Sequence, residues 1–342
     1  MEVLPNFTVV RAHTIDDVIA ARAANPDSRL LGGGTDLIVN VRRGIVSPPA
    51  LIDVATVEGM CAIKVDTDSI EVGASVRLAA LARHPGVMRH FAAIAQAAGS
   101  IAGPTHRNMG TVGGNLCLDT RCIFYNQSEW WRGALNHCLK TTGDICHVAP
   151  KSRGVCFATF SGDLAPAFLA FGAEIDIAGP DGPRTLPLDR LYIGYARQDQ
   201  PITEESGDGK HYLALRSGEF IVAVRAKRRS GLCSGFEKIR IRRSIEFPVA
   251  SVAAALRREG DVLVDLRLAC TGTNPRPVLL AGTEALCGRA LNDETFKAID
   301  DLVRDQVMSM KTTFTPGHYR RRMAGVLARR LVERLFAEAA SV

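Results

Sequence analysis

The chain has 342 residues, of which 46% are hydrophobic and 23% charged, a composition typical of a globular protein with two or three domains. Its formal net charge of +6 is spread along the chain, with short basic runs at residues 225–229, 240–243 and 320–322. A nucleic-acid-binding protein usually gathers its basic residues on one element, so we expect no nucleic-acid partner. These basic runs are better explained as solvent-exposed surfaces or as contacts with partner subunits than as a nucleic-acid-binding site.

The N-terminus, MEVLPNFTVVRAHTIDD, lacks the basic start and apolar core of a secretory signal, and no apolar run is long enough to cross a bilayer. We therefore expect a cytoplasmic protein with no membrane contact. In a reducing compartment, nine cysteines, an odd number, do not predict a disulfide framework. Clustered cysteines in such a protein more often hold a metal.

Hydrophobic pattern and propensity predict mixed α/β structure in the N-terminal half. Thr14 or Asp16 is placed to cap the first helix. The predicted strands are 7–11, 29–31, 51–54 and 69–73, and the predicted helices are 14–24, 38–42, 78–83 and 87–98.

The second half is predicted to contain a helix at 165–171, a strand at 174–178 and a polar, glycine-containing linker at 198–210. Beyond the linker, the predicted strands 220–225, 233–240 and 262–270 surround a predicted helix at 249–257. The closing helices are expected between residues 292 and 340. The chain shows no internal repeat and no low-complexity tract.

Two glycine loops have the chemistry of anion sites. The first is Gly32-Gly33-Gly34-Thr35-Asp36, and the second is the sequence RNMGTVGGN at residues 107–115. Glycines free the backbone N–H groups to approach a phosphate, and threonine adds a hydroxyl donor. The first loop is neither a G-x-G-x-x-G fingerprint nor a P-loop, which disfavours nicotinamide binding on a Rossmann unit and ATP hydrolysis. Taken singly, each loop is also explained as a simple turn, but the pair favours a nucleotide cofactor.

Four motifs occur in an order that resembles one family. These are LLGGGTDL, RNMGTVGGN, SGDLAPAFLAFGAEI and GFEKIRIRRSIEFPVAS, and together they resemble the flavin-binding subunits and domains of the xanthine dehydrogenase and carbon monoxide dehydrogenase family. The resemblance implies an α/β (α+β) FAD-binding fold of the vanillyl-alcohol oxidase type. It implies an N-terminal FAD-binding subdomain at 1–55, a second subdomain at 56–211 and a C-terminal domain at 212–342.

The resemblance also implies the FAD-binding residues. The FAD diphosphate would be held by Arg29, Leu30, Leu31, Gly32, Gly33, Gly34, Thr35, Asp36, Thr111, Val112, Gly113, Gly114 and Asn115. The rest of the cofactor would contact Ile101, Asp163, Ile221 and Lys238. A lysine facing the isoalloxazine favours the anionic reduced flavin. The alternative for Lys238 is an exposed cation on a strand beside Arg240.

A cysteine-rich segment separates two of these motifs. In the family, the GGN turn leads within a few residues to an SPxGDL-like stretch, whereas here residues 118–160 intervene. The segment contains Cys122, Cys138, Cys146 and Cys156. Cys117 lies just before the segment and could replace any one of these four as a metal ligand. Four thiolates are the ligand set of a [4Fe-4S] cluster or of a structural zinc. The long, uneven spacing favours the cluster.

Other residues of the segment bear on that choice. His137 and His147 are next to Cys138 and Cys146, so a zinc site remains an alternative to the cluster. A second alternative is that the cysteines are free and buried and bind no metal. Trp130 and Trp131, with Phe124 and Tyr125 nearby, are expected to form an apolar shell around the site.

The insertion makes the chain most similar to the β subunit of the 4-hydroxybenzoyl-CoA reductases. That similarity implies electron flow from ferredoxin through the [4Fe-4S] cluster to FAD, then to a small subunit with two [2Fe-2S] centres and a large molybdenum-cofactor subunit. It also implies that two heterotrimers form a dimer. It implies that this chain only transfers electrons and therefore contains no catalytic residue. Two alternatives remain: an FAD subunit of an oxidising molybdenum hydroxylase with a zinc-stabilised or structural insertion, and a non-enzymatic scaffold.

Overall fold

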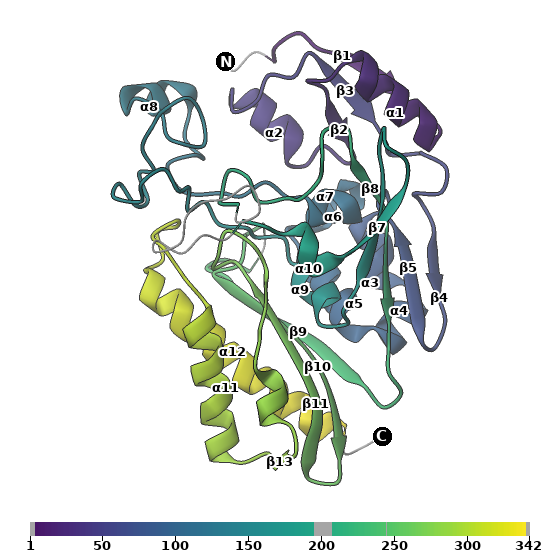
Figure 1. Ribbon diagram of the computed structural model, residues 1–342, viewed down its shortest axis with the longest axis vertical. Helices are drawn as coiled ribbons and strands as arrows, with labels where there is room; N and C mark the ends of the chain where they lie inside the picture. The colour runs from purple at the N-terminus through teal and green to yellow at the C-terminus, as the bar shows by residue number, and fades with distance from the viewer. Residues whose placement is uncertain (1–3, 195–206, 244, 340–342) are drawn as a thin grey trace.

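The structure is a computed structural model that describes residues 4–194, 207–243 and 245–339. Three sheets follow one another along the chain, and Figure 1 shows them stacked along the long axis of the molecule. Within the described ranges, no helix combines the length and the apolar character needed to cross a bilayer.

The first sheet is parallel, with strand order β1-β3-β2. Thr14 caps its first helix in a capping box, as its position predicts, because its side chain accepts the Asp17 N–H while Asp17 reaches back to the cap. The elements of this part are β1 (Thr8–Arg11), α1 (Ile15–Ala24), β2 (Arg29–Leu31), α2 (Leu37–Arg42) and β3 (Ala50–Asp53).

The second sheet is antiparallel, with strand order β4-β5-β8-β6-β7. Its strands are β4 (Ile63–Val65), β5 (Ser69–Gly73), β6 (Glu174–Ala178), β7 (Arg184–Pro187) and β8 (Phe220–Lys227). The helices of this part are α3 (Leu78–Arg83), α4 (Pro85–His90), α5 (Ala92–Ser100), α6 (Pro104–Met109), α7 (Val112–Leu116), α8 (Glu129–Ala134), α9 (Leu164–Leu169) and α10 (Leu188–Leu191). β8 follows the boundary predicted at residue 211, yet it pairs with β5 and β6 in this sheet.

The third sheet is antiparallel, with strand order β12-β11-β10-β9 and with β13 paired to β11. Its elements are β9 (Cys233–Ile239), β10 (Ala250–Glu259), β11 (Val262–Thr271), β12 (Val278–Leu279), the 3-10 helix η1 (Thr283–Leu286) and β13 (Arg289–Ala290). The closing helices are α11 (Asp293–Gln306) and α12 (Gly317–Glu338).

The predicted helix at 249–257 is wrong, because these residues form most of β10. Ala250, Val252 and Ala254 of this strand face the apolar core shared with α11 and α12. Ala253 and Ala255 face the core of the second sheet instead. Both faces of β10 are buried, so the sequence lacks the apolar–polar alternation of a half-exposed strand, and its alanines suggested a helix.

Two further predictions change in detail. The single helix predicted at 87–98 is broken at Phe91, where α4 ends and α5 begins, and the Phe91 ring is fully buried. Residues 198–206 of the predicted linker lie outside the described residues. The remainder is not exposed linker, because Asp208 and Gly209 are buried against the cysteine-rich segment.

Candidate functional site

The two glycine loops lie directly against each other. A Cβ added at Gly33 would lie 1.9 Å from the Met109 carbonyl oxygen, and one at Gly32 would lie 2.7 Å from Thr111 Oγ1. Gly34 has a φ of 70°, which glycine adopts without strain. The loops, 75 residues apart in sequence between Gly34 and Met109, therefore form one cradle of bare backbone.

The second loop is held by its own short helix and by the segment after β5. Thr111 caps α7 by accepting the Gly114 N–H at 3.2 Å. The N–H groups of Val112 and Gly113 donate to the carbonyls of Val76 and Ala74 at 3.0 and 2.8 Å. These bonds fix the loop to the second sheet.

The segments that flank the cysteine insertion touch each other. Asn115 Oδ1 accepts the N–H of Leu164 at 3.0 Å, and a Cβ at Gly162 would lie 2.4 Å from the Asn115 carbonyl oxygen. Asp163 is therefore beside the second glycine loop, as the order of motifs suggests.

Asp163 and Lys238 form a buried ion pair that joins the start of α9 to β9. Lys238 Nζ lies 2.6 Å from Asp163 Oδ2, and each side chain is 4% exposed. Ser251 donates to the other oxygen of Asp163 at 3.2 Å. Burial raises the pKa of Asp163, and Lys238 acts in the opposite direction. The alternative of Lys238 as an exposed cation is wrong.

Of the remaining predicted flavin contacts, Ile101 lies next to this pair in the structure, and Ile221 lies in the second sheet. Lys238 and Arg240 both donate to the Ser100 carbonyl, which immediately precedes Ile101. Arg107 donates to the Ile101 carbonyl at 2.7 Å. Ile221 is buried in β8 opposite Ile177.

Arg29 is the exposed first residue of β2, three residues before the first glycine loop, and it is paired with Leu51 of β3.

The cysteine-rich segment leaves and rejoins the body of the protein at one point. Arg121 and Thr159 exchange backbone hydrogen bonds of 2.8 and 2.7 Å. Figure 1 shows the segment, with α8, beside α2 at the edge of the molecule. Arg132 of α8 donates to the carbonyls of Arg43 and Gly44 at 3.2 and 3.1 Å, which fixes the segment to the end of α2.

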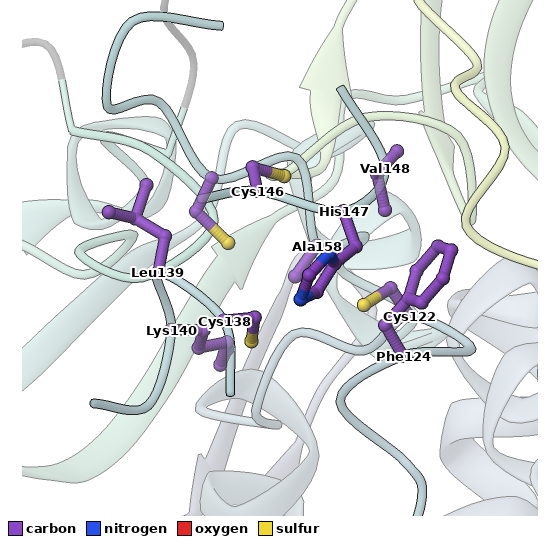
Figure 2. Close-up of a pocket in the computed structure, with 10 residues that line it drawn as sticks. Cys122, Phe124, Cys138, Leu139, Lys140, Cys146, His147, Val148 and Ala158 are labelled. Atoms are coloured by element: carbon purple, nitrogen blue, oxygen red, sulfur yellow. The ribbon is translucent and has the colours of Figure 1, made fainter. Parts of the chain in front are cut away.

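The four predicted ligands line one cavity. Cys122, Cys138, Cys146 and Cys156 are all buried around it, and Figure 2 shows the first three with His147. Cys117 is not part of the lining, and burial raises the pKa of its thiol to about 12. The structure thus brings together the four cysteines of the insertion and leaves Cys117 aside.

Donor groups are directed at these sulfurs. The Tyr125 N–H donates to Cys122 Sγ at 3.3 Å, and the Thr141 hydroxyl lies 3.8 Å from Cys138 Sγ. Cys146 has a pKa lowered to about 6, first by a hydrogen bond from Cys156 and then by the N–H groups of Phe157, Ala149 and Val148. Hydrogen bonds to sulfur stabilise thiolates and tune clusters bound by them.

The four thiols do not converge at metal-coordinating geometry. Within the described residues, no three side chains of His, Cys, Asp or Glu are grouped as a metal site. The donor chemistry of the cavity nevertheless suits a four-thiolate group, because four buried sulfurs line it and no carboxylate does.

The histidines offer little to a zinc site. His147 lines the cavity, but its Nε2 lies 2.5 Å from the His137 carbonyl oxygen. The His137 ring is not part of the lining, and its Nε2 lies 3.9 Å from Glu129 Oε1.

The aromatic shell is only partly as predicted. Phe124 lines the cavity and its ring centroid lies 6.2 Å from that of Trp131 and 5.4 Å from that of His147. Tyr125 is buried. Trp130 is 80% exposed, so its prediction as part of the shell is wrong, because α8 directs this side chain to solvent.

Two charged residues that the sequence did not single out connect the cavity to the rest of the protein. Lys140 lines the cavity, and Arg121 pairs with Asp36 of the first glycine loop. In the sequence, Lys140 and Arg121 cannot be told apart from solvent-exposed basic residues. Their position inside the insertion was the one feature that could have marked them as site residues.

The chain matches two known families over most of its length. Residues 5–226 match the FAD binding domain in molybdopterin dehydrogenase, and residues 235–335 match the CO dehydrogenase flavoprotein C-terminal domain. The aldehyde oxidoreductase FAD-binding subunit PaoB of Escherichia coli (strain K12) is 29% identical over 329 residues, which cover 94% of this chain and 97% of the relative. The carbon monoxide dehydrogenase medium chain of Hydrogenophaga pseudoflava is 24% identical over 340 residues, covering 98% of this chain and 99% of that one.

Solved structures show the same fold. The carbon monoxide dehydrogenase of Hydrogenophaga pseudoflava that lacks the Mo-pyranopterin moiety superposes with a TM-score of 0.77 at 21% identity, over 98% of this chain and 99% of that chain. The predicted fold class is thereby confirmed. The chain belongs to the FAD-binding subunits of the xanthine dehydrogenase and carbon monoxide dehydrogenase family of molybdenum hydroxylases.

Proposed function

We propose that this chain is the FAD- and [4Fe-4S]-carrying electron-transfer subunit of a molybdenum enzyme that reductively dehydroxylates 4-hydroxybenzoyl-CoA. The observation that carries the proposal is the cavity lined by Cys122, Cys138, Cys146 and Cys156 in a segment inserted between two flavin motifs. Neither the matched families nor the names of the relatives assign a metal centre to that segment, so the cluster is part of the proposal.

The glycine cradle suits the FAD diphosphate. Gly32 and Gly33 admit no side chain, because the second loop fills the space that a Cβ would need. The donors for an anionic diphosphate would be the backbone N–H groups of the first loop and the Thr35 and Thr111 hydroxyls, because the Val112, Gly113 and Gly114 N–H groups of the second loop already have protein acceptors. Val112, Gly113, Gly114 and Asn115 continue the same loop.

The Asp163–Lys238 pair is suited to the flavin ring. When bound, FAD exchanges electrons in pairs or singly, and the chain itself supplies orientation and charge. Lys238 is held by Asp163 and by the Ser100 carbonyl, so its ammonium is fixed rather than mobile. A fixed cation near the isoalloxazine favours the anionic reduced form.

The cysteine cavity suits a one-electron centre close to the flavin site. Its sulfurs accept N–H and O–H bonds, and the Arg121–Asp36 pair joins the base of the insertion to the first glycine loop. Electrons from a ferredoxin would enter at this centre and leave through FAD. No residue of this chain acts on the substrate in the proposal.

The partners follow from the same proposal. A small subunit with two [2Fe-2S] centres and a large molybdenum-cofactor subunit would complete a heterotrimer, two of which pair in the cytoplasm. The relatives named as FAD-binding subunits and medium chains fit a multisubunit enzyme of this kind.

A second candidate is an oxidising molybdenum hydroxylase whose insertion binds zinc or is purely structural. It is favoured by relatives named for aldehyde, xanthine and carbon monoxide oxidation. A non-enzymatic scaffold is disfavoured by the family to which the chain belongs.

Metal and cofactor analysis of the purified complex decides between the two candidates. We expect one FAD and about four iron and four sulfide per copy of this chain, in addition to the iron of the small subunit. A copy of this chain with zinc or no metal in the insertion contradicts the cluster. The substrate is tested separately, by oxidation of a reduced low-potential dye that depends on 4-hydroxybenzoyl-CoA.

A further inference from the structure

The ammonium group of Lys140 lies in an unusual position between two tyrosine rings. Its Nζ lies 4.9 Å from the ring centroid of Tyr125 and 5.5 Å from that of Tyr212. The side chain is 6% exposed and lines the same cavity as the four cysteines. A cation over an aromatic face is attracted by the ring quadrupole, most strongly when water is excluded.

Four oxygen atoms fix this ammonium group. Lys140 Nζ donates to Asp119 Oδ1 at 2.7 Å, to the Thr120 carbonyl at 3.0 Å and to the Gly209 carbonyl at 2.9 Å, and it also contacts the Thr120 hydroxyl. An ammonium group has only three protons, so its donors are all engaged. Lys140 therefore has a defined place and cannot move out to solvent without leaving buried acceptors unpaired.

The counter-ion is not part of the cavity lining. Asp119 is 27% exposed and lies outside the set of residues that line the cavity, whereas Lys140 belongs to that set.

 The cavity is thus lined by the cation and not by its carboxylate partner. Coulomb energy falls with distance and is screened least in a buried site, so a buried cation in the lining acts on a charge among the sulfurs more strongly than a partly exposed carboxylate outside it.

The two tyrosines join Lys140 to both glycine loops. On one side, the Arg121 guanidinium carbon lies 5.5 Å from the Tyr125 ring centroid, and Arg121 pairs with Asp36 of the first loop. On the other side, the Tyr212 hydroxyl donates at 3.2 Å to the carbonyl of Cys117, which ends the helix of the second loop. One buried cation is therefore shared by the cysteine cavity and by the supports of both loops.

We propose that Lys140 is a positioning residue that raises the reduction potential of the centre in the cysteine cavity and fixes that cavity relative to the two glycine loops. This inference rests on the proposed function, because it requires a redox centre bound by the four cysteines. Reduction adds one electron to that centre and so adds one negative charge. A fixed cation stabilises the reduced state more than the oxidised state, and net charge is one of the properties that set cluster potentials.

Substituting each partner of the Lys140–Asp119 ion pair is expected to shift the reduction potential in opposite directions. Lys140→Met removes the positive charge and is expected to shift the potential in the negative direction. Asp119→Asn leaves the lysine without its counter-ion and is expected to shift the potential in the positive direction. We expect about a tenfold change in the ratio of reduced to oxidised centre at fixed potential, which equals about 59 mV for one electron.

The experiment is a potentiometric titration of the whole complex, with the reduced cluster followed by low-temperature electron paramagnetic resonance. Lys140→Arg keeps the charge and is expected to restore most of the wild-type potential. Lys151→Met removes an exposed lysine of the same insertion and serves as the matched control, with no expected shift. Iron and flavin are counted in every variant, so that loss of the centre is not mistaken for a change of potential.

The outcomes separate the inference from the proposed function. A wild-type complex without a cluster in this subunit contradicts both. A cluster whose potential is the same in Lys140→Met, Asp119→Asn and wild type overturns the inference alone. If Lys140→Met does not retain its cluster, Asp119→Asn decides: a positive shift supports the inference, and no shift or a negative shift overturns it.

Discussion

Arg121 Nη2 lies 2.8 and 2.9 Å from the two carboxylate oxygens of Asp36, and this ion pair joins the cysteine-rich segment to the first glycine loop. The Arg121 side chain is buried, while Asp36 is partly exposed and also accepts the amide of Asn40 at 2.9 Å. Because Arg121 belongs to the cysteine-rich segment and Asp36 to the first glycine loop, this ion pair holds the two segments in a fixed relative position.

Arg121→Met is therefore expected to destabilise the protein and to weaken FAD retention. The change leaves the Asp36 carboxylate without its cation, at a cost of about 1–3 kcal/mol in the free energy of unfolding. Denaturant unfolding and flavin content after gel filtration measure the two effects. Arg153→Met, at an exposed arginine of the same segment, is the control, and equal behaviour of both variants contradicts a role for the ion pair.

Gly33→Ala is expected to separate the two glycine loops. The added methyl group would occupy the position of the Met109 carbonyl, 1.9 Å away, so the backbone of one loop must move. We expect loss of FAD and a destabilisation of about 1–3 kcal/mol, as for overpacking of a well-packed site. Gly99→Ala is the control, because its Cβ would have only an ordinary 3.9 Å contact with Ala82. Normal flavin content in Gly33→Ala would argue against the cradle.

Phe124→Ala and Trp130→Ala are expected to differ sharply, although both remove an aromatic ring from the insertion. Phe124 lines the cysteine cavity and packs on Trp131 and His147, so its loss opens the site to water and lowers iron content. Trp130 is exposed and should be replaceable without change in iron, flavin or stability. The measurement is the iron-to-flavin ratio, and a drop in Trp130→Ala would contradict the exposed position of that ring.

Arg320→Met is expected to be severe. This arginine is fully buried in α12 and donates to the carbonyls of Val249, Met310 and Gly272 and to the Thr312 hydroxyl. Burial lowers its pKa to about 10, which still leaves it charged at neutral pH. Several buried acceptors would lose their donor, so we expect a loss of about 3 kcal/mol or more in the free energy of unfolding. Arg330→Met on the exposed face of the same helix should change stability by less than about 0.5 kcal/mol.

Glu219 gives a prediction for pH. Its carboxylate pairs with Arg184 at 2.7 Å, and this hydrogen bond lowers the pKa of Glu219 below its unfolded value. The resulting stabilisation is present above the unfolded pKa of about 4.3 and is lost as pH falls through the lower, folded pKa. Glu219→Gln should therefore be less stable than wild type at pH 6, with a difference that shrinks by pH 3. A difference independent of pH in urea unfolding would contradict this assignment.

Much of the fold could be predicted from local sequence. Thr14 caps its helix because a capping box is a local motif, and the strands predicted at 51–54, 69–73 and 262–270 carry their own β-branched or alternating patterns. The strand at Ala250–Glu259 could not be recognised in the same way. Its helix-like alanines are packed between two layers, and only the presence of both layers makes a strand the favourable choice.

The candidate site shows the same division. The four cysteines were recognisable as a set because their side-chain chemistry is rare and they are close together in sequence. Lys140 was not singled out from the sequence and Trp130 was predicted to lie in the apolar shell, yet in the structure the lysine is buried and the tryptophan is exposed. Burial depends on which segments pack together, and residue type alone does not fix it.

The sequence by itself determined the family motifs, the bare glycine backbone and the number of thiols in the insertion, because each depends on residue identity and order. Only the tertiary structure decided that Gly33 faces Met109, that Cys117 stays outside the cavity and that Arg121 reaches Asp36. Those contacts join residues far apart in the chain. Their energies come from close packing and from charges removed from water, which arise only when the segments meet.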